Sequence, residues 1–199
     1  MARPAGRGIE KQRAADAEVK EAAKAAASRK KGILTALVAV AVVGGVALFI
    51  ALQPPPPGVL FADLGNQHIT LGDAHAAYNS APPSSGPHTG GLANWGEASE
   101  PVPAEIFVHN LEDAGVVLAY DCPDGCEALL ADLREVVADF EGRNLLLTPY
   151  EGIRDTSGTA RRVAAVAWTR VFYLDSLDAR EGRQVRTFIN LYEGIDHHK

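Results

Sequence analysis

The sequence predicts an α+β protein in which a single N-terminal transmembrane helix precedes a small domain with a mostly antiparallel sheet. About four strands would form this sheet and two helices would cover it. Three observations carry this prediction: an uncharged apolar run at residues 33–52, short β-branched segments after residue 105, and two later segments with apolar residues at helical spacing. The expected order in the domain is strand, strand, helix, strand, strand, helix (ββαββα).

Residues 1–32 form a basic segment that we expect to be a solvated tail. They contain nine Lys and Arg against four Asp and Glu, whereas the rest of the chain contains ten against twenty-one. The tail has no apolar stripe with which to dock on a core. The acidic remainder would repel a phosphate backbone, which argues against nucleic acid as a partner.

The run Ile33–Leu52 predicts a single-pass signal anchor. Its twenty residues carry no charge and as a helix would extend about 30 Å, the thickness of a bilayer's hydrocarbon core. The competing interpretation is a cleaved signal peptide, whose apolar region is normally shorter. The basic cluster Arg29-Lys30-Lys31 comes first, so the positive-inside rule places residues 1–32 in the cytoplasm. The rest of the chain would then lie outside the cell (inner) membrane, with the lipid bilayer as a partner of residues 33–52.

A proline-rich spacer, residues 53–58, separates the anchor from an extracytoplasmic domain over residues 59–199. Its four consecutive prolines end the helix and favour a short stiff rod. The domain opens with a long region, rich in Pro, Gly and Ser, that continues to about residue 103. An irregular segment of this length in a compact domain is usually functional or tied down by other contacts.

Regular structure is expected from residue 106. The first two strands would pair as a hairpin around the turn Glu112-Asp-Ala-Gly115. Gly142 is expected to end the first helix, and Val185, Phe188, Ile189 and Tyr192 form the buried stripe of the second. The predicted strands are 106–111, 116–120, 144–149 and 163–174, and the predicted helices are 127–141 and 178–192.

The stretch Tyr78-Asn-Ser-Ala-Pro-Pro-Ser-Ser-Gly-Pro-His88 carries a family resemblance. Together with Val108-His-Asn-Leu-Glu112 and Leu147-Thr-Pro-Tyr150, it resembles the bacterial family known as domain of unknown function 3105. The resemblance covers most of the domain and implies a membrane-anchored extracytoplasmic protein without an established activity. It also implies a histidine directly after Leu-Glu, where this chain has Asp113. A carboxylate can replace an imidazole as a ligand, but the preferred metal then changes.

Three histidines are candidate metal ligands: His68, His88 and His109. His88 ends a rigid loop, whereas His109 lies among apolar residues of a predicted strand, where a satisfied core histidine is the competing interpretation. If the three imidazoles converge, they suit copper or zinc. Each ring then needs its second nitrogen fixed by a carboxylate or carbonyl group. The candidates for supporting roles are Glu112, Asp113 and Tyr78, although hairpin carboxylates are often only solvated. His75 and the terminal pair His197-His198 are expected at the surface.

The two cysteines, Cys122 and Cys126, form a Cys-x-x-x-Cys motif. A disulfide between them would close a loop of only five residues, which restricts the unfolded chain little. Cys126 is expected near a helix N-terminus, where a thiolate is stabilised. The spacing is similar to that of Sco, the thioredoxin-like copper-delivery proteins, which the rest of the chain does not resemble. A structural disulfide, a metal-binding pair and a redox pair all remain open.

Two functions from different classes follow. The first is an extracytoplasmic domain that binds copper or zinc through His88, His109 and His68, or through the cysteine pair. The alternative is a non-catalytic structural or interaction module that presents its long loop to an envelope protein, with Cys122 and Cys126 in a disulfide. An enzyme is the weaker interpretation, because the chain has no Gly-x-Ser-x-Gly, P-loop, dinucleotide or His-Glu-x-x-His motif. No base is placed beside the hydroxyls of Ser84 and Ser85.

Overall fold

A computed structural model describes residues 6–53 and 55–198 of the chain in two compact units, Met1–Pro55 and Pro56–Lys199. Residues 1–5 of the predicted tail and Pro54 of the predicted spacer lie outside the described residues. Side chains are described from residue 18 onward, apart from those at positions 22, 23, 25–28, 30, 32–34 and 36.

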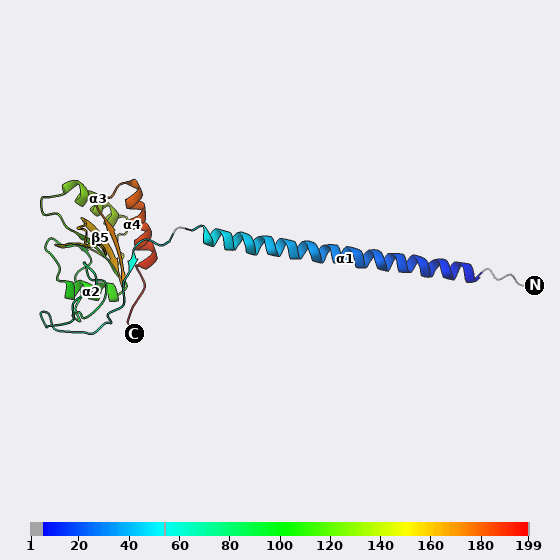
Figure 1. Ribbon diagram of the computed structural model, residues 1–199, viewed down its shortest axis with the longest axis horizontal. Coiled ribbons are helices and arrows are strands. Elements are labelled where there is room, and N and C mark those ends of the chain that lie inside the picture. Colours follow the sequence, from blue (N-terminus) through cyan, green and yellow to red (C-terminus); the bar gives the residue numbers. More distant parts are fainter. Residues whose placement is uncertain (1–5, 54, 199) are drawn as a thin grey trace, which may run out of the picture. The chain divides into compact units, whose positions relative to one another are not determined.

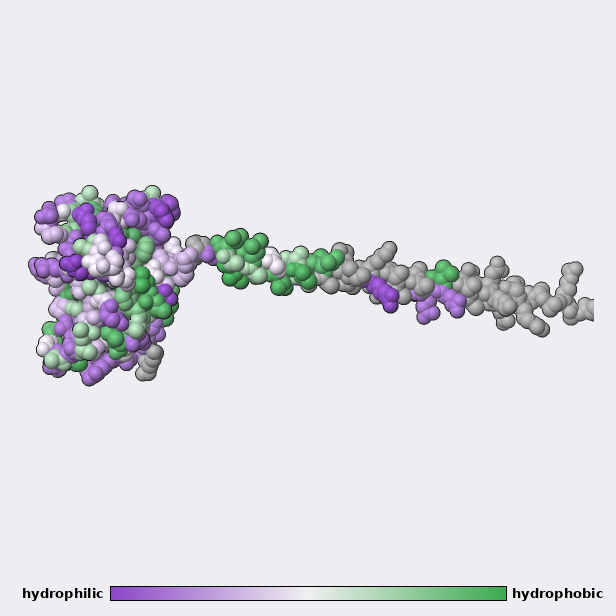
Figure 2. Space-filling model, viewed as in Figure 1, coloured by the Kyte–Doolittle hydropathy of each residue, from purple (hydrophilic) through white to green (hydrophobic). Residues whose placement is uncertain are grey.

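The first unit contains one long helix, α1 (Gly6–Ala51) (Figure 1). It includes both the basic segment and the apolar run, so the segment expected as a solvated tail is helical from Gly6. Large apolar side chains such as Leu37, Phe49 and Ile50 are exposed, and they form a hydrophobic surface along the later part of the helix (Figure 2). Among the residues with described side chains, no helix is both long and apolar enough to cross a membrane. The predicted span 33–52 includes positions 33, 34 and 36, which lie outside that set, and its insertion stays a prediction.

The second unit is built on a mixed six-stranded sheet with the order β1-β6-β5-β3-β4-β2. Strand β3 pairs parallel with β4, and β4 pairs parallel with β2, while the other neighbours are antiparallel. The prediction of a mostly antiparallel four-stranded sheet was therefore wrong, although an α+β architecture is confirmed. The strands are β1 (Val59–Leu60), β2 (Gly96–Glu97), β3 (Val116–Tyr120), β4 (Leu145–Pro149), β5 (Val163–Ala167) and β6 (Arg170–Leu174).

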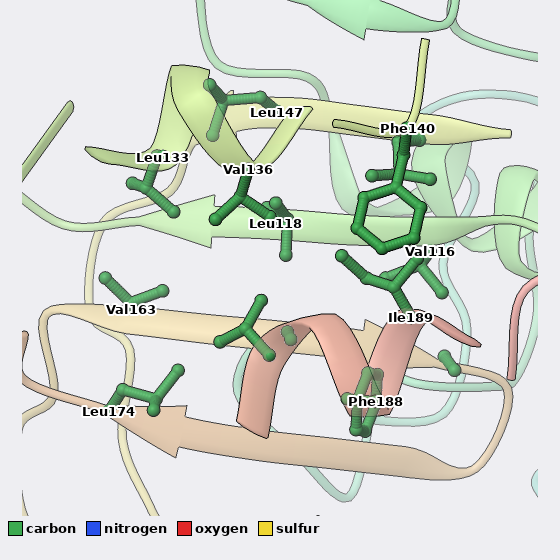
Figure 3. Packing of buried hydrophobic residues seen from close by; sticks show 14 of the residues in the cluster. Val116, Leu118, Leu133, Val136, Phe140, Leu147, Val163, Leu174, Phe188 and Ile189 are labelled. Carbon is green, nitrogen blue, oxygen red and sulfur yellow. The ribbon is translucent and has the colours of Figure 1, made fainter. Parts of the chain in front are cut away.

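Helices α3 (Glu127–Ala138) and α4 (Ala179–Tyr192) cover one face of this sheet. Leu133 and Val136 of α3 and Phe188 and Ile189 of α4 pack onto strand residues such as Leu118 (Figure 3). The two segments form helices because their buried apolar residues lie three and four positions apart, at Leu129, Leu133 and Val136 in α3 and at Val185, Phe188 and Ile189 in α4. Asp178 also caps α4, because its Oδ1 accepts hydrogen bonds from the N–H groups of Arg180 and Glu181 at 2.8 Å.

The opposite face is covered by α2 (Ala104–Glu112), where the sequence predicted a strand at 106–111. Phe107, Val108 and Leu111 of this helix are fully buried against that face of the sheet. The strand prediction was wrong because Ile, Phe and Val favour strands, whereas the spacing of the buried residues is helical. The hairpin at 112–115 is therefore absent, and the chain turns there from helix α2 into β3.

The final predicted strand, 163–174, is a hairpin of two strands. β5 and β6 are joined at Trp168-Thr169, and Thr169 has a left-handed φ of 60°. Trp168 lies in the turn rather than on a strand face with Phe172. The segment between β1 and α2, residues 61–103, contains only isolated bridges and the short β2, which confirms that this part of the chain is irregular up to residue 103.

Candidate metal centre

Helix α2 places His109 and Glu112 on the same face, three residues apart. The Glu112 side chain is 1% exposed and the His109 side chain 10%. A buried carboxylate is costly unless hydrogen bonds or a cation compensate for the lost hydration. Glu112 therefore needs partners, and the irregular segment provides them.

Two parts of the irregular segment run side by side and bring His68 next to His88. The His88 N–H donates to Gln67 O at 3.0 Å, and the Ile69 N–H donates to His88 O at 2.8 Å. The Tyr78 hydroxyl donates to Pro87 O at 2.6 Å and holds the loop immediately before His88. The Tyr78–His88 stretch is thus an ordered support that fixes the position of one imidazole.

The three imidazoles meet at one oxygen of the buried carboxylate. Glu112 Oε2 lies 2.9 Å from His88 Nε2, 3.6 Å from His68 Nε2 and 3.8 Å from His109 Nδ1. The ring centroids are 4.9–5.2 Å apart. One ligand atom from each of the four residues can be chosen so that all lie within 4.8 Å of one another. The His68 side chain is 52% exposed and gives the group its access to solvent.

The hydrogen bonds of this group leave imidazole nitrogens available to bind a cation. His88 Nδ1 lies 2.8 Å from Gly86 O, and since a carbonyl oxygen only accepts, Nδ1 carries the proton. In the neutral ring, Nε2 then directs its lone pair at the Glu112 carboxylate. His109 Nδ1 is buried and has no hydrogen-bond partner. The His88 lone pair that faces the carboxylate, and the unpartnered Nδ1 of His109 beside it, are satisfied by a bound metal ion or by protons on the imidazoles.

The pKa shifts of His109 and Glu112 are in the direction that favours metal binding. Burial lowers the pKa of His109 below its ordinary value, against an opposing effect of Asp113, so the ring is held neutral. Burial by itself would raise the pKa of Glu112, but the hydrogen bond from Asn66 and, when their rings carry a second proton, His88 and His198 outweigh it. The net pKa of Glu112 is lowered, and Asn66 Nδ2 donates to Glu112 Oε1 at 2.7 Å. A neutral imidazole and an ionised carboxylate are the forms that bind metals.

A second possible group of ligands adjoins the first and consists of His109, Asp113 and His198. His198 Nε2 lies 3.2 Å from Asp113 Oδ1 and 3.7 Å from Glu112 Oε2. Its other nitrogen, Nδ1, lies 2.7 Å from Asp196 Oδ1, and this hydrogen bond raises the pKa of His198. The C-terminal segment therefore brings a further imidazole to the edge of the centre.

The structure brings His68, His88, His109 and Glu112 together. Asp113 lies at the edge of this group, and Tyr78 holds the loop immediately before His88. Glu112 is central, whereas the sequence offered it only as a support or a solvated hairpin residue. His109 belongs to a helix and not to a strand. His198 was missed, because nothing local in the sequence indicates that the C-terminus returns to α2. Cys122 and Cys126 are joined in a disulfide that packs against the α3–α4 core, and they belong to neither possible ligand group of the described residues.

Comparison with known proteins identifies the family. A family model described as "Protein of unknown function (DUF3105)" matches residues 70–198, which is more than half of the chain. The protein belongs to the DUF3105 family. Of the centre, His88, His109, Glu112 and His198 lie inside the region that matches DUF3105, and His68 lies two residues before it. No curated protein and no solved structure matches the chain. The DUF3105 description states no activity, so function is argued from the site.

Proposed function

We propose that this DUF3105 protein binds one transition metal ion, zinc or copper, through His68, His88, His109 and Glu112. The observation that supports it is the approach of three imidazole nitrogens to one oxygen of a buried carboxylate. A buried histidine that has only a structural role needs a single partner. Here four imidazoles, those of His68, His88, His109 and His198, lie within 4 Å of the same carboxylate oxygen.

The distances suit a shared ion. Ligands at about 2.0–2.1 Å from a tetrahedral metal lie about 3.3 Å from one another. The three distances from Glu112 Oε2, which are 2.9, 3.6 and 3.8 Å, bracket this value. Gly86 O fixes the ring of His88 and Asn66 fixes the carboxylate, which is the kind of support that metal ligands normally receive from their surroundings.

The ligand set favours zinc or copper. Imidazole suits both metals, and a carboxylate is an acceptable fourth ligand. Methionine occurs only at position 1 and both cysteines are in a disulfide, so the ligands typical of Cu(I) sites are not offered. We propose that the domain stores, senses or passes on the ion, with the exposed His68 as the point of exchange.

Metal analysis tests the proposal directly. The full-length protein is stripped with a chelator, equilibrated with Zn²⁺ or Cu²⁺, freed of excess ion and measured for metal content. We expect close to one equivalent in the unaltered protein and a large loss in the His88→Ala/His109→Ala variant, because it removes two of four ligands.

The matched control is His75→Ala. It removes an imidazole that is in neither possible ligand group of the described residues, and it should keep the full metal content. Equal, substoichiometric metal in all three proteins would contradict the proposal. That result would favour the interaction module that presents its long loop to an envelope protein.

We further propose that residues 33–52 anchor the protein in the cell (inner) membrane, with residues 1–32 in the cytoplasm and the domain outside. The support is the uncharged sequence of this run, the preceding Arg29-Lys30-Lys31 cluster and the exposed apolar side chains from Leu37 to Leu52. The protein should stay in the membrane fraction after alkaline carbonate extraction. In intact spheroplasts, external protease should digest the domain. Release by carbonate, or protection of the domain, would contradict the anchor or its orientation.

A further inference from the structure

The disulfide Cys122–Cys126 lies at the junction of a parallel strand–helix–strand unit. Cys122 comes two residues after the end of β3, and Cys126 is the residue that immediately precedes α3. Helix α3 then leads to β4, which pairs parallel with β3. The two Cα atoms are 5.7 Å apart. In thioredoxin-like proteins the reactive cysteine pair lies near a unit of this type.

The rest of the sheet extends this likeness in connectivity. The central strands have the order β4-β3-β5-β6, in which β5 and β6 form an antiparallel hairpin that is followed by α4. This order resembles that of a thioredoxin-type core, except that an irregular segment, residues 150–162, joins β4 to β5 where that core has a helix; the cysteines lie where β3 leads into α3. The sequence alone did not predict this arrangement of strands. The Cys-x-x-x-Cys spacing is similar to that of Sco proteins, but the rest of the chain does not resemble them.

The pair is open to a partner. Pro123, Asp124 and Gly125 are exposed, and both cysteines are partly exposed. A groove of about 440 Å³ runs beside them, and it is lined by residues 121–125 and 160–162. An extended peptide segment can therefore approach Cys122 without unfolding of the domain.

The surroundings also favour a leaving thiolate at Cys126. No side chain caps the N-terminus of α3, so the N–H groups of its first turn remain available to stabilise negative charge. Charged residues face the pair from both sides of the groove. Asp121, Asp124 and Glu127, which is in the first turn of α3, oppose a thiolate, while Arg161 and Arg162 favour it. Arg161 also pairs with Asp155 and Asp175.

A purely structural role explains the disulfide poorly. The ring that it closes has five residues, so it constrains the unfolded chain much less than a long-range disulfide would. The core beneath it is already held by α3, α4 and the central strands. We therefore expect that packing to survive when the bond is broken, as a reversible redox centre requires.

We propose that Cys122 and Cys126 form a thiol–disulfide exchange centre whose partner is a dithiol segment of another protein. A partner thiolate attacks Cys122 Sγ, the S–S bond breaks, and Cys126 leaves as a thiolate. The second partner thiolate attacks the partner sulfur of the mixed disulfide and releases the Cys122 thiolate. The partner is oxidised to a disulfide by two electrons, and its two protons end on Cys122 and Cys126. This centre is independent of the proposed metal site.

Redox equilibration gives the first test. The full-length protein is incubated without denaturant in glutathione buffers of increasing reduced-to-oxidised ratio, quenched with acid and labelled with a thiol-specific mass tag. The fraction of reduced protein should rise from near zero to near one, reverse on reoxidation and leave the circular dichroism spectrum unchanged. A pair that stays oxidised until the protein is unfolded would overturn the proposal, since structural disulfides resist reduction by glutathione.

Transfer to a model dithiol gives the second test. The oxidised protein should convert a reduced two-cysteine peptide to its disulfide about tenfold faster than equimolar oxidised glutathione does. Cys126→Ser should accumulate a mixed disulfide when it is mixed with the oxidised peptide, because the resolving thiol is missing. The control Cys122→Ser/Cys126→Ser should transfer nothing, yet keep the metal content of the unaltered protein. Transfer no faster than that of glutathione would overturn the proposal.

Discussion

At the scale of single residues, Glu112 determines the character of the centre. Its carboxylate is buried, accepts a hydrogen bond from Asn66 at 2.7 Å and has four imidazoles within 4 Å. The buried residue His109 directs an unpartnered nitrogen at it. Such an arrangement costs stability when no cation is bound, since every lone pair that faces the carboxylate needs a proton or a metal.

In the metal-free protein the contribution of His109 to stability should decrease as the pH falls below about 6.5, while that of His198, whose pKa is raised, changes in the opposite direction. The pKa of His109 is lowered from its ordinary value of 6.5, so below that value the unfolded chain binds more protons at this ring than the folded chain. The contribution of His109 to the free energy of unfolding therefore decreases as the pH falls through 6.5 towards the lowered value. The shift at Glu112 has the same sign and acts below 4.5. Denaturant titrations of the chelated protein at pH 7.5, 6.5 and 5.5 measure the effect.

His109→Gln supplies the comparison for this prediction. Five ionisable groups face the ring, namely His68, His88, Glu112, Asp113 and His198, and they remain in the variant. The difference between the two proteins therefore isolates the contribution of His109. The variant should depend less on pH between 7.5 and 5.5. An equal or steeper dependence in the variant would show that His109 is not held neutral by burial.

At the scale of elements, α2 connects the core to the centre. Phe107 and Leu111 anchor the helix on the sheet, and His109 and Glu112 carry the ligands. Asn110, which is fully buried, donates to Ala93 O at 2.9 Å and accepts from the Ala93 N–H at 3.0 Å. Apolar burial and these hydrogen bonds thus hold the helix on the sheet, and its position depends on the tight turn that leads into β3.

Gly115→Ala should destabilise the domain by about 1–3 kcal/mol, the usual cost of forcing extra atoms into a packed site. A Cβ atom at this position would lie 2.5 Å from Asn110 O and against the ring of Trp95. The matched control is Gly91→Ala, where a Cβ atom meets nothing within 4 Å. Urea denaturation of both variants measures the difference. A loss in Gly115→Ala no larger than that in Gly91→Ala would contradict the packing at this turn.

Sequence reasoning predicted α3, α4 and the central strands, since each has a continuous apolar pattern of its own. It failed at α2, where Ile106-Phe-Val108 favours a strand locally and burial against the sheet decides for a helix. The three histidines were found because imidazoles are rare enough to stand out. The central position of Glu112 and the approach of His198 depend on contacts between distant segments, which no local pattern encodes.

At the scale of the whole molecule, the chain consists of two units with separate roles. All of the buried apolar residues of the two core clusters lie between Phe107 and Ile189 in the second unit. The residues proposed to bind the metal and the disulfide belong to the same unit. The first unit is one helix whose described side chains are exposed.

Residues 56–199 should fold without the first unit. We expect this fragment to unfold thermally within about 3 °C of the domain transition of the full-length protein, because no core contact is removed. Zinc or copper should raise the midpoint of both proteins, since a ligand that binds only the folded state stabilises it. Differential scanning calorimetry with and without metal checks both statements. A fragment that fails to fold would show that the first unit contributes to the core.

The path of the C-terminal segment has a practical consequence for recombinant work. The His197 N–H donates to Glu112 O at 3.0 Å, and the Gly194 N–H donates to Ala114 O at 2.8 Å. A purification tag fused to the C-terminus would therefore begin next to His198 and the carboxylates that it contacts. A polyhistidine tag there would compete for the same ions, so metal contents would report the tag together with the site. Tags belong at the other end of the chain, or should be of a kind that does not chelate.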